Sequence, residues 1–157
     1  MVEYWCIKQN PYQYTDETQM KNFIMNQQVV TCPFGHFEEF TKNVISRKYN
    51  KDNLIWSSRN QDKTFIESVK INDIILIPFR HEKCIFAKII SDPIENFETG
   101  LFVSRHSNKI EIMRNKTIEP FRPIVRRIQI IKETNINPGL RWSICKSKIV
   151  EDAFQRL

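Results

Sequence analysis

Glycine is scarce in this chain. The only three glycines, Gly35, Gly100 and Gly139, are far apart. A dinucleotide-binding fingerprint needs closely spaced glycines, and a phosphate-binding loop needs two glycines before a lysine. The sequence also lacks the His-Glu-x-x-His of zinc proteases and the Gly-x-Ser-x-Gly of esterases. These absences exclude the common nucleotide-binding and hydrolase motifs, and we predict a protein that is not an enzyme and uses no cofactor.

Paired cysteines are absent as well. Cys6, Cys32, Cys84 and Cys145 form no Cys-x-x-Cys, and Cys32 with His36 is the nearest approach to a zinc pair. We therefore predict no metal site and four free thiols in a reducing compartment.

Long apolar runs are also missing. No run approaches the roughly 20 residues that span a bilayer. The first residues, Met-Val-Glu-Tyr-Trp, lack the basic and apolar parts of a signal peptide. We expect an intracellular protein, cytoplasmic or nuclear, without a membrane partner.

Acidic residues are too few to balance the basic ones: 24 Lys and Arg face 18 Asp and Glu, for a net charge of +6. Between positions 105 and 132 only Glu111 and Glu119 oppose the basic side chains. Those side chains are Arg105, Lys109, Arg114, Lys116, Arg122, Arg126, Arg127 and Lys132. A solvated surface and a face that contacts phosphates both explain such a cluster, and the sequence leaves the choice open.

Apolar patterns predict short elements throughout. Strands are expected at 4–9, 29–32, 54–56, 74–79, 84–90, 101–104, 109–113 and 124–132. Helical spacing is found after Thr15 or Asp16, at 37–49, at 60–69 and at 147–154, where Ile149, Val150 and Phe154 should point inward. Turns are expected at Asn72-Asp73 and around 80–83, and the segment 140–145 stays unassigned. Because strands and helices do not alternate as in βαβ units, we predict one α+β domain over 1–157. It should be a small, strongly curved β-barrel with three or four short helices.

Few residues suggest catalysis. His36, His81 and His106 each lie near a turn without a paired acid or base, and Glu38-Glu39 are adjacent residues on a helix, which do not share a face. A small nuclease built from Asp73, Glu82 and Lys83 can be imagined. A turn and a hairpin tip account for those three residues more simply.

Tryptophan and basic residues remain. Trp5 and Trp142 lie in patterns typical of core packing. Trp56 differs because Ser57, Ser58, Arg59, Asn60 and Gln61 follow it directly. A tryptophan at such a junction can present one face to a cleft, stack a base, and leave the polar neighbours to read its edge.

The order of these segments resembles the PUA-like superfamily, and within it the EVE domain and the related YTH domain. The matching pieces are Tyr4-Trp5-Cys6-Ile7-Lys8, Trp56-Ser57-Ser58-Arg59-Asn60, the run 70–77, the run 85–93, and 138–150 with its Leu140-Arg141-Trp142-Ser143. Trp56-Ser57-Ser58 is similar to the YTH segment that supplies a tryptophan to an aromatic cage. The N-terminal modules of some modification-dependent restriction proteins share the layout, which leaves open a separate effector protein as a partner.

The chain departs from this pattern at defined points. The spacing from Trp56 to the Arg-Asn pair is one residue shorter, Asn72 and Phe86 replace glycines, and the stretch 29–53 is an insertion. Asn72 can adopt the left-handed conformation that a glycine would serve.

The resemblance implies a non-catalytic reader of a modified base in DNA or RNA. The base pocket would comprise Trp56, Ser57, Ser58, Asn60, Asp62 and, opposite Trp56, Trp5. Phosphates would be held by Arg59, Arg105, Arg126, Arg127 and Arg141. Two alternatives stay open: a protein-interaction or structural module on the same scaffold, and the small nuclease.

Overall fold

The structure of the protein is a computed structural model, which describes residues 1–9, 17–32, 63–100, 102–104, 118–120, 122–136, 138–139 and 144–157. Two α-helices are described, α1 (Glu17–Gln27) and α4 (Lys148–Gln155). A single π-helical turn, η4 (Thr64–Ser68), is closed by the Val69 N–H donating to the Thr64 carbonyl at 3.1 Å. The strands are β1 (Tyr4–Ile7), β2 (Val29–Thr31), β3 (Ile74–Ile77), β4 (Cys84–Ile89), β5 (Phe102–Ser104), β6 (Ile118–Pro120), β7 (Val125–Thr134) and β8 (Ile144–Lys146).

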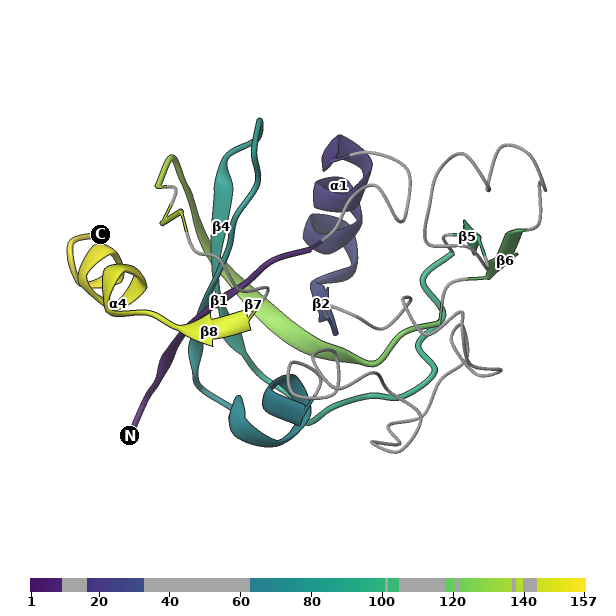
Figure 1. Ribbon diagram of the computed structural model, residues 1–157, viewed down its shortest axis with the longest axis horizontal. Helices are drawn as coiled ribbons and strands as arrows, with labels where there is room; N and C mark the ends of the chain where they lie inside the picture. Colours follow the sequence, from purple (N-terminus) through teal and green to yellow (C-terminus); the bar gives the residue numbers. More distant parts are fainter. Residues whose placement is uncertain are drawn as a thin grey trace.

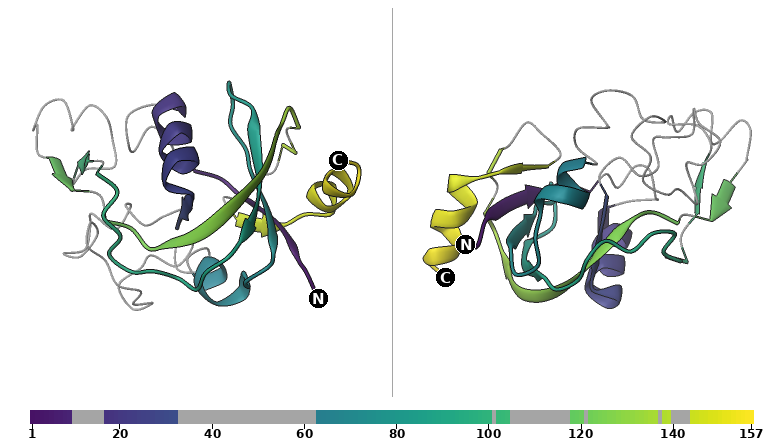
Figure 2. Two further views of the ribbon diagram at one scale, coloured as in Figure 1. Left: turned by 180° about the vertical axis from the view of Figure 1, so that it is seen from behind. Right: turned by 90° about the horizontal axis from the view of Figure 1, so that it is seen from below.

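Six of these strands form one mixed sheet in the order β2-β7-β4-β3-β1-β8. Strands β1 and β3 are parallel, and the other neighbours are antiparallel. The sheet curls into a half-barrel along the long strand β7 (Figures 1 and 2). Strands β5 and β6 form a separate antiparallel pair. The predicted α+β class and the predicted curvature of the sheet are confirmed.

The two faces of the curled sheet carry separate cores. Trp5, Ile75 and Ile85 belong to the inner core, which includes buried residues of α1. Leu76 and Phe86, their neighbours along the strands, belong to the outer core under α4. This division follows from the period of two in a β-strand, which sends successive side chains to opposite faces. In Figure 1, α1 and α4 accordingly lie on opposite sides of the sheet.

The C-terminal helix shows where the sequence prediction was right and where it was wrong. Ser147 caps α4 by accepting from the Val150 N–H, and Val150 is fully buried. Phe154 is half-buried and packs edge-on against Phe86, with ring centroids 5.6 Å apart. Ile149, expected to point inward, is 51% exposed. Consecutive helical residues face different directions, so Val150 at the inward position leaves Ile149 in solvent.

Both predicted turns beside β3 are present. Asn72 has φ +79°, the left-handed conformation that asparagine tolerates, and it leads the chain into β3. At the other end of β3, residues 80–83 connect it to β4. The carboxylate of Glu17, in the first turn of α1, accepts from the Arg80 and His81 N–H groups of this hairpin. The hairpin is thereby fixed to the helix on the inner face.

Some expectations differ from the structure or lie outside the residues described. Strand β5 pairs with β6, with Phe102 opposite Pro120. The strand expected at 109–113, the helix at 37–49 and the strand at 54–56 fall outside the described residues. Strand β8 occupies part of the segment that the sequence left unassigned. Among the residues described, no helix has the length and apolar character needed to cross a membrane.

Candidate functional site

Three of the predicted site residues are described: Trp5, Arg126 and Arg127. The other eight fall outside the described part of the chain: Trp56, Ser57, Ser58, Arg59, Asn60, Asp62, Arg105 and Arg141. Six of those eight belong to the segment just before η4. Because η4 is the described element nearest to that segment in the sequence, we describe the contacts that hold η4 in place.

Trp5 is a core residue, only 3% exposed. Its indole Nε1–H donates to Oδ2 of Asp73 at 2.9 Å, and Lys146 Nζ lies 5.5 Å from its ring centroid. An indole enclosed in this way offers no free face to a base. The expectation that Trp5 stacks opposite Trp56 is corrected, since its burial and hydrogen bond make it a structural anchor of β1.

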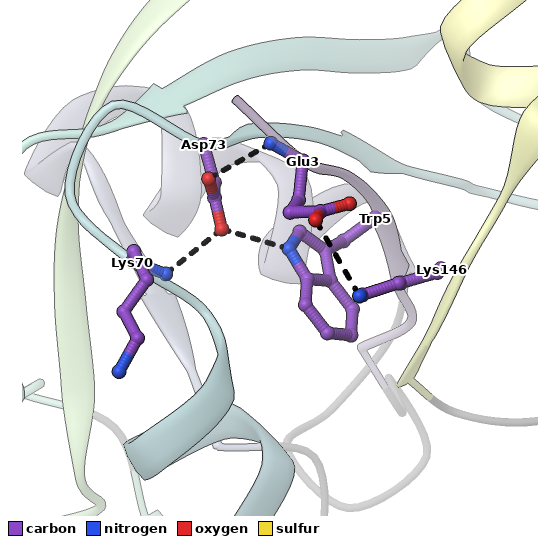
Figure 3. A network of polar contacts seen from close by, with 5 residues as sticks. All are labelled: Glu3, Trp5, Lys70, Asp73 and Lys146. Carbon is purple, nitrogen blue, oxygen red and sulfur yellow. Dashed lines mark hydrogen bonds and ion pairs between the residues drawn. The ribbon is translucent and has the colours of Figure 1, made fainter. Parts of the chain in front are cut away.

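Asp73 is the centre of a buried polar network (Figure 3). Its carboxylate, on a residue 2% exposed, accepts from the Glu3 N–H at 3.0 Å, from the Trp5 indole, and from the Lys70 N–H at 2.9 Å. Three N–H donors offset the cost of burying a carboxylate. The network joins β1 to the turn that follows η4.

Arg126 is buried as well, only 1% exposed. Its Nη1 donates to the carbonyl oxygens of Phe65 at 2.9 Å and Val69 at 2.8 Å, and its Nε donates to that of Ser91 at 2.8 Å. Burial lowers the pKa of this guanidinium, while the negative charges of Asp92 and Asp73 oppose that effect. A guanidinium enclosed by three carbonyls is not open to a phosphate in solvent. The expectation that Arg126 binds phosphate is therefore corrected.

The two networks converge on η4. Arg126 holds the carbonyls of Phe65, within the turn, and Val69, just after it, while Asp73 holds the N–H of Lys70. Phe65 itself is fully buried in the inner core. The support immediately after the Trp56–Asp62 segment is thus fixed from two sides.

Two exposed lysines, Lys146 and Lys70, lie beside the Asp73 network. Lys146 is 60% exposed and lies 3.5 Å from a Glu3 carboxylate oxygen (Figure 3). Lys70 is exposed, and its ammonium donates to the Glu67 carbonyl. Arg127, the neighbour of Arg126, is exposed with its guanidinium 5.8 Å from the Phe97 ring centroid. Of the described candidates for phosphate contact, Arg127 alone has the required access.

The residues of the imagined nuclease are not brought together. Asp73 precedes β3, whereas Glu82 and Lys83 belong to the hairpin after β3, so the strand separates them. Glu82 accepts from the Thr18 hydroxyl at 2.7 Å. No group of three His, Cys, Asp or Glu side chains suited to a metal ion exists among the residues described.

The thiols of Cys6, Cys84 and Cys145 line the outer core under α4. Burial is the main cause that raises the pKa of Cys6 to about 12, and it raises the pKa values of Cys84 and Cys145 as well. Neutral thiols are weak nucleophiles and weak metal ligands. They fill the core as small apolar groups.

The sequence located Asp73 in a turn. It did not reveal the hydrogen bonds of the Asp73 carboxylate, or those of Arg126 to the carbonyls of Phe65 and Val69. A signal for Arg126 was present, because it lies two residues from both Ile124 and Ile128. A period of two then places it on the apolar face.

No protein-family model matches the chain, and no curated protein matches it either.

Proposed function

We propose that this domain is a PUA-like, EVE/YTH-like module that captures a modified base of DNA or RNA without catalysis. The observation that carries the proposal is the double anchoring of η4 by Arg126 and Asp73. Binding sites work when their supporting residues are fixed before the ligand arrives. The anchored turn directly follows Trp56–Asp62, the segment with the composition of a base pocket.

In this mechanism a base leaves its stack, or is taken from a single strand, and lies against Trp56. Ser57, Ser58 and Asn60 read its edge through side chain or backbone, and Asp62 accepts a hydrogen bond. Arg59, Arg105, Arg127 and Arg141 hold phosphates. Arg126 and Trp5 do not contact the base. Arg126 holds η4 through the carbonyls of Phe65 and Val69, and Trp5 donates to Asp73, which holds the Lys70 N–H just after η4.

The test is the affinity of Trp56→Ala for an oligonucleotide that carries the modified base and for its unmodified counterpart. Loss of about 1–3 kcal/mol of stacking should weaken binding of the modified strand about ten- to a hundredfold. Trp56→Phe, which keeps an aromatic face, should recover part of the loss. Unchanged affinity of Trp56→Ala for a modified strand that the wild type prefers would overturn the proposal.

The competing functions predict different results. A protein-interaction module on this scaffold would bind modified and plain strands equally weakly and lose both as salt rises. A nuclease would cleave plasmid DNA or RNA in the presence of a divalent metal. Either outcome replaces the base-reading proposal.

A further inference from the structure

Part of the outer sheet face is left uncovered by α4. The helix packs over Cys6, Leu76 and Phe86. Farther across the sheet, β4 and β7 present Lys88, Arg127 and Lys132 on that same face. We call these three residues the outer cationic strip.

The strand register places the strip. Lys88 is opposite Gln129, and Lys132 is opposite Phe86, whose side chain lies in the outer core. Ile128 and Ile130 face the inner core, so Arg127 and Gln129 between and beside them face outward. The Ile90 N–H donates to the Arg127 carbonyl at 2.9 Å, which makes Arg127 a diagonal neighbour of Lys88. Diagonal neighbours on a sheet are about 7–8 Å apart, so the charges form a row.

The strip carries charge that no carboxylate neutralises within the part of the chain described. Lys21, Lys146, Lys148 and Arg122 each form an ion pair with a glutamate or aspartate. No such pair involves Lys88, Arg127 or Lys132 among the described residues. Arg127 instead lies by the Phe97 ring, and Lys88 is half-buried, which lets its stem lie on the sheet while its ammonium reaches solvent.

The cations are held by rigid structure. All three residues belong to the paired strands β4 and β7, and Ser91 Oγ accepts from the Arg127 N–H at 2.8 Å. Arg127 is also next to Arg126, which anchors η4 from the opposite face. One end of the strip therefore lies next to the strand position that holds η4.

We propose that the outer cationic strip binds the phosphate backbone of the nucleic-acid strand whose base enters the pocket. This inference rests on the proposed function and adds Lys88 and Lys132 to its contacts. The strip and the pocket contribute differently to binding. The strip gives affinity that depends on salt but not on sequence, and the pocket gives preference for the modification.

The experiment compares two variants that remove equal charge. The strip variant is Lys88→Gln, Arg127→Gln and Lys132→Gln. The control variant is Arg80→Gln, Lys148→Gln and Arg156→Gln, three exposed residues that do not belong to the strip. Affinity for a single-stranded oligonucleotide is measured across salt concentrations, with thermal unfolding to verify that both variants fold.

Each lost phosphate contact should reduce the slope of log affinity against log salt by about 0.7, so the strip variant should lose about 2 in slope. The control variant should keep the wild-type slope. The ratio of affinities for modified and plain strands should stay unchanged in the strip variant.

Equal slopes for the strip and control variants would overturn the inference. The inference would also be overturned if the strip variant, but not the control variant, lost binding to anionic phosphatidylserine vesicles while keeping its affinity for the oligonucleotide, because a membrane surface would then be the ligand. Failure of the base-reading proposal looks different: Trp56→Ala would leave the modification preference intact while the strip variant still loses slope.

Discussion

Arg126 and Arg127 are consecutive residues of β7 with opposite environments. Arg126 is 1% exposed and donates to the carbonyls of Phe65, Val69 and Ser91 on the inner side of the sheet. Arg127 is exposed on the outer side, beside the ring of Phe97. The same type of side chain holds η4 at one position and faces solvent at the next.

Residue type alone therefore does not assign a role to an arginine in a basic segment. A strand sends neighbouring side chains to opposite faces, so half of a basic run can be structural. Removing the inner arginine should cost stability, whereas removing the outer one should cost affinity.

Arg126→Ala should destabilise the protein by about 3–5 kcal/mol, because three backbone carbonyls lose their donor inside the protein. At about 2–4 °C per kcal/mol for a chain of this size, thermal unfolding should occur at least 6 °C lower. Arg127→Ala is the matched control and should change stability by no more than about 0.5 kcal/mol. Equal effects of the two substitutions would contradict the assignment of the faces.

Asp73→Asn should lower stability by about 1–3 kcal/mol. The carboxylate accepts three N–H donors through both oxygens, whereas an amide has one accepting oxygen and must point its NH₂ group at a donor. Denaturant unfolding measures the loss. Asp92→Asn, at an exposed position, serves as the control, and a comparable loss there would count against the network.

Cys6 should react much more slowly than Cys145 with iodoacetamide in the folded protein. The two residues are opposite each other on β1 and β8, but Cys6 is buried with its pKa raised to about 12, whereas Cys145 is half-exposed. At pH 8 only about one Cys6 thiol in ten thousand is then a thiolate. Peptide mapping by mass spectrometry gives both rates. Comparable rates in the folded protein would argue against the packing of α4, whereas equal rates are expected in urea.

Glu133→Gln should have the smallest effect. The Lys21 ammonium lies 2.5 Å from the Glu133 carboxylate and holds the pKa of Glu133 below its ordinary value. A lowered folded-state pKa means that the stabilisation is present above the unfolded value of about 4.3 and is lost as the pH falls through the lower folded-state pKa. Urea unfolding at neutral pH should show a small loss in the variant. At a pH below the folded-state pKa of Glu133 the two proteins should be equally stable, and a difference that persisted there would exclude the ion pair as its cause.

The sequence predicted the parts of this fold that depend on local patterns. Helical spacing gave α1, the Asn72-Asp73 turn was placed correctly, and apolar runs gave β3 and β4. It did not predict the pairing of β1 with β8, because sheet order depends on contacts distant in sequence.

For the candidate site, the sequence selected residues by type and could not tell support from contact. Trp5 and Arg126 were assigned to the ligand, but their partners, Asp73 and the carbonyls of η4, are more than 50 positions away in the chain. Only the folded sheet brings these groups together. Period-two alternation could have identified Arg126 as inward-facing, and it also identifies Arg127 as outward-facing.

The central claim, capture of a modified base, is tested most directly by the affinity of the whole chain for modified and plain oligonucleotides. Each would be offered single- and double-stranded, at a low and a high salt concentration. Charge attraction weakens steeply with salt, whereas stacking and edge hydrogen bonds do not. We predict that a modified strand stays bound at the higher salt after the plain strand is released. Parallel loss of both strands would contradict the account.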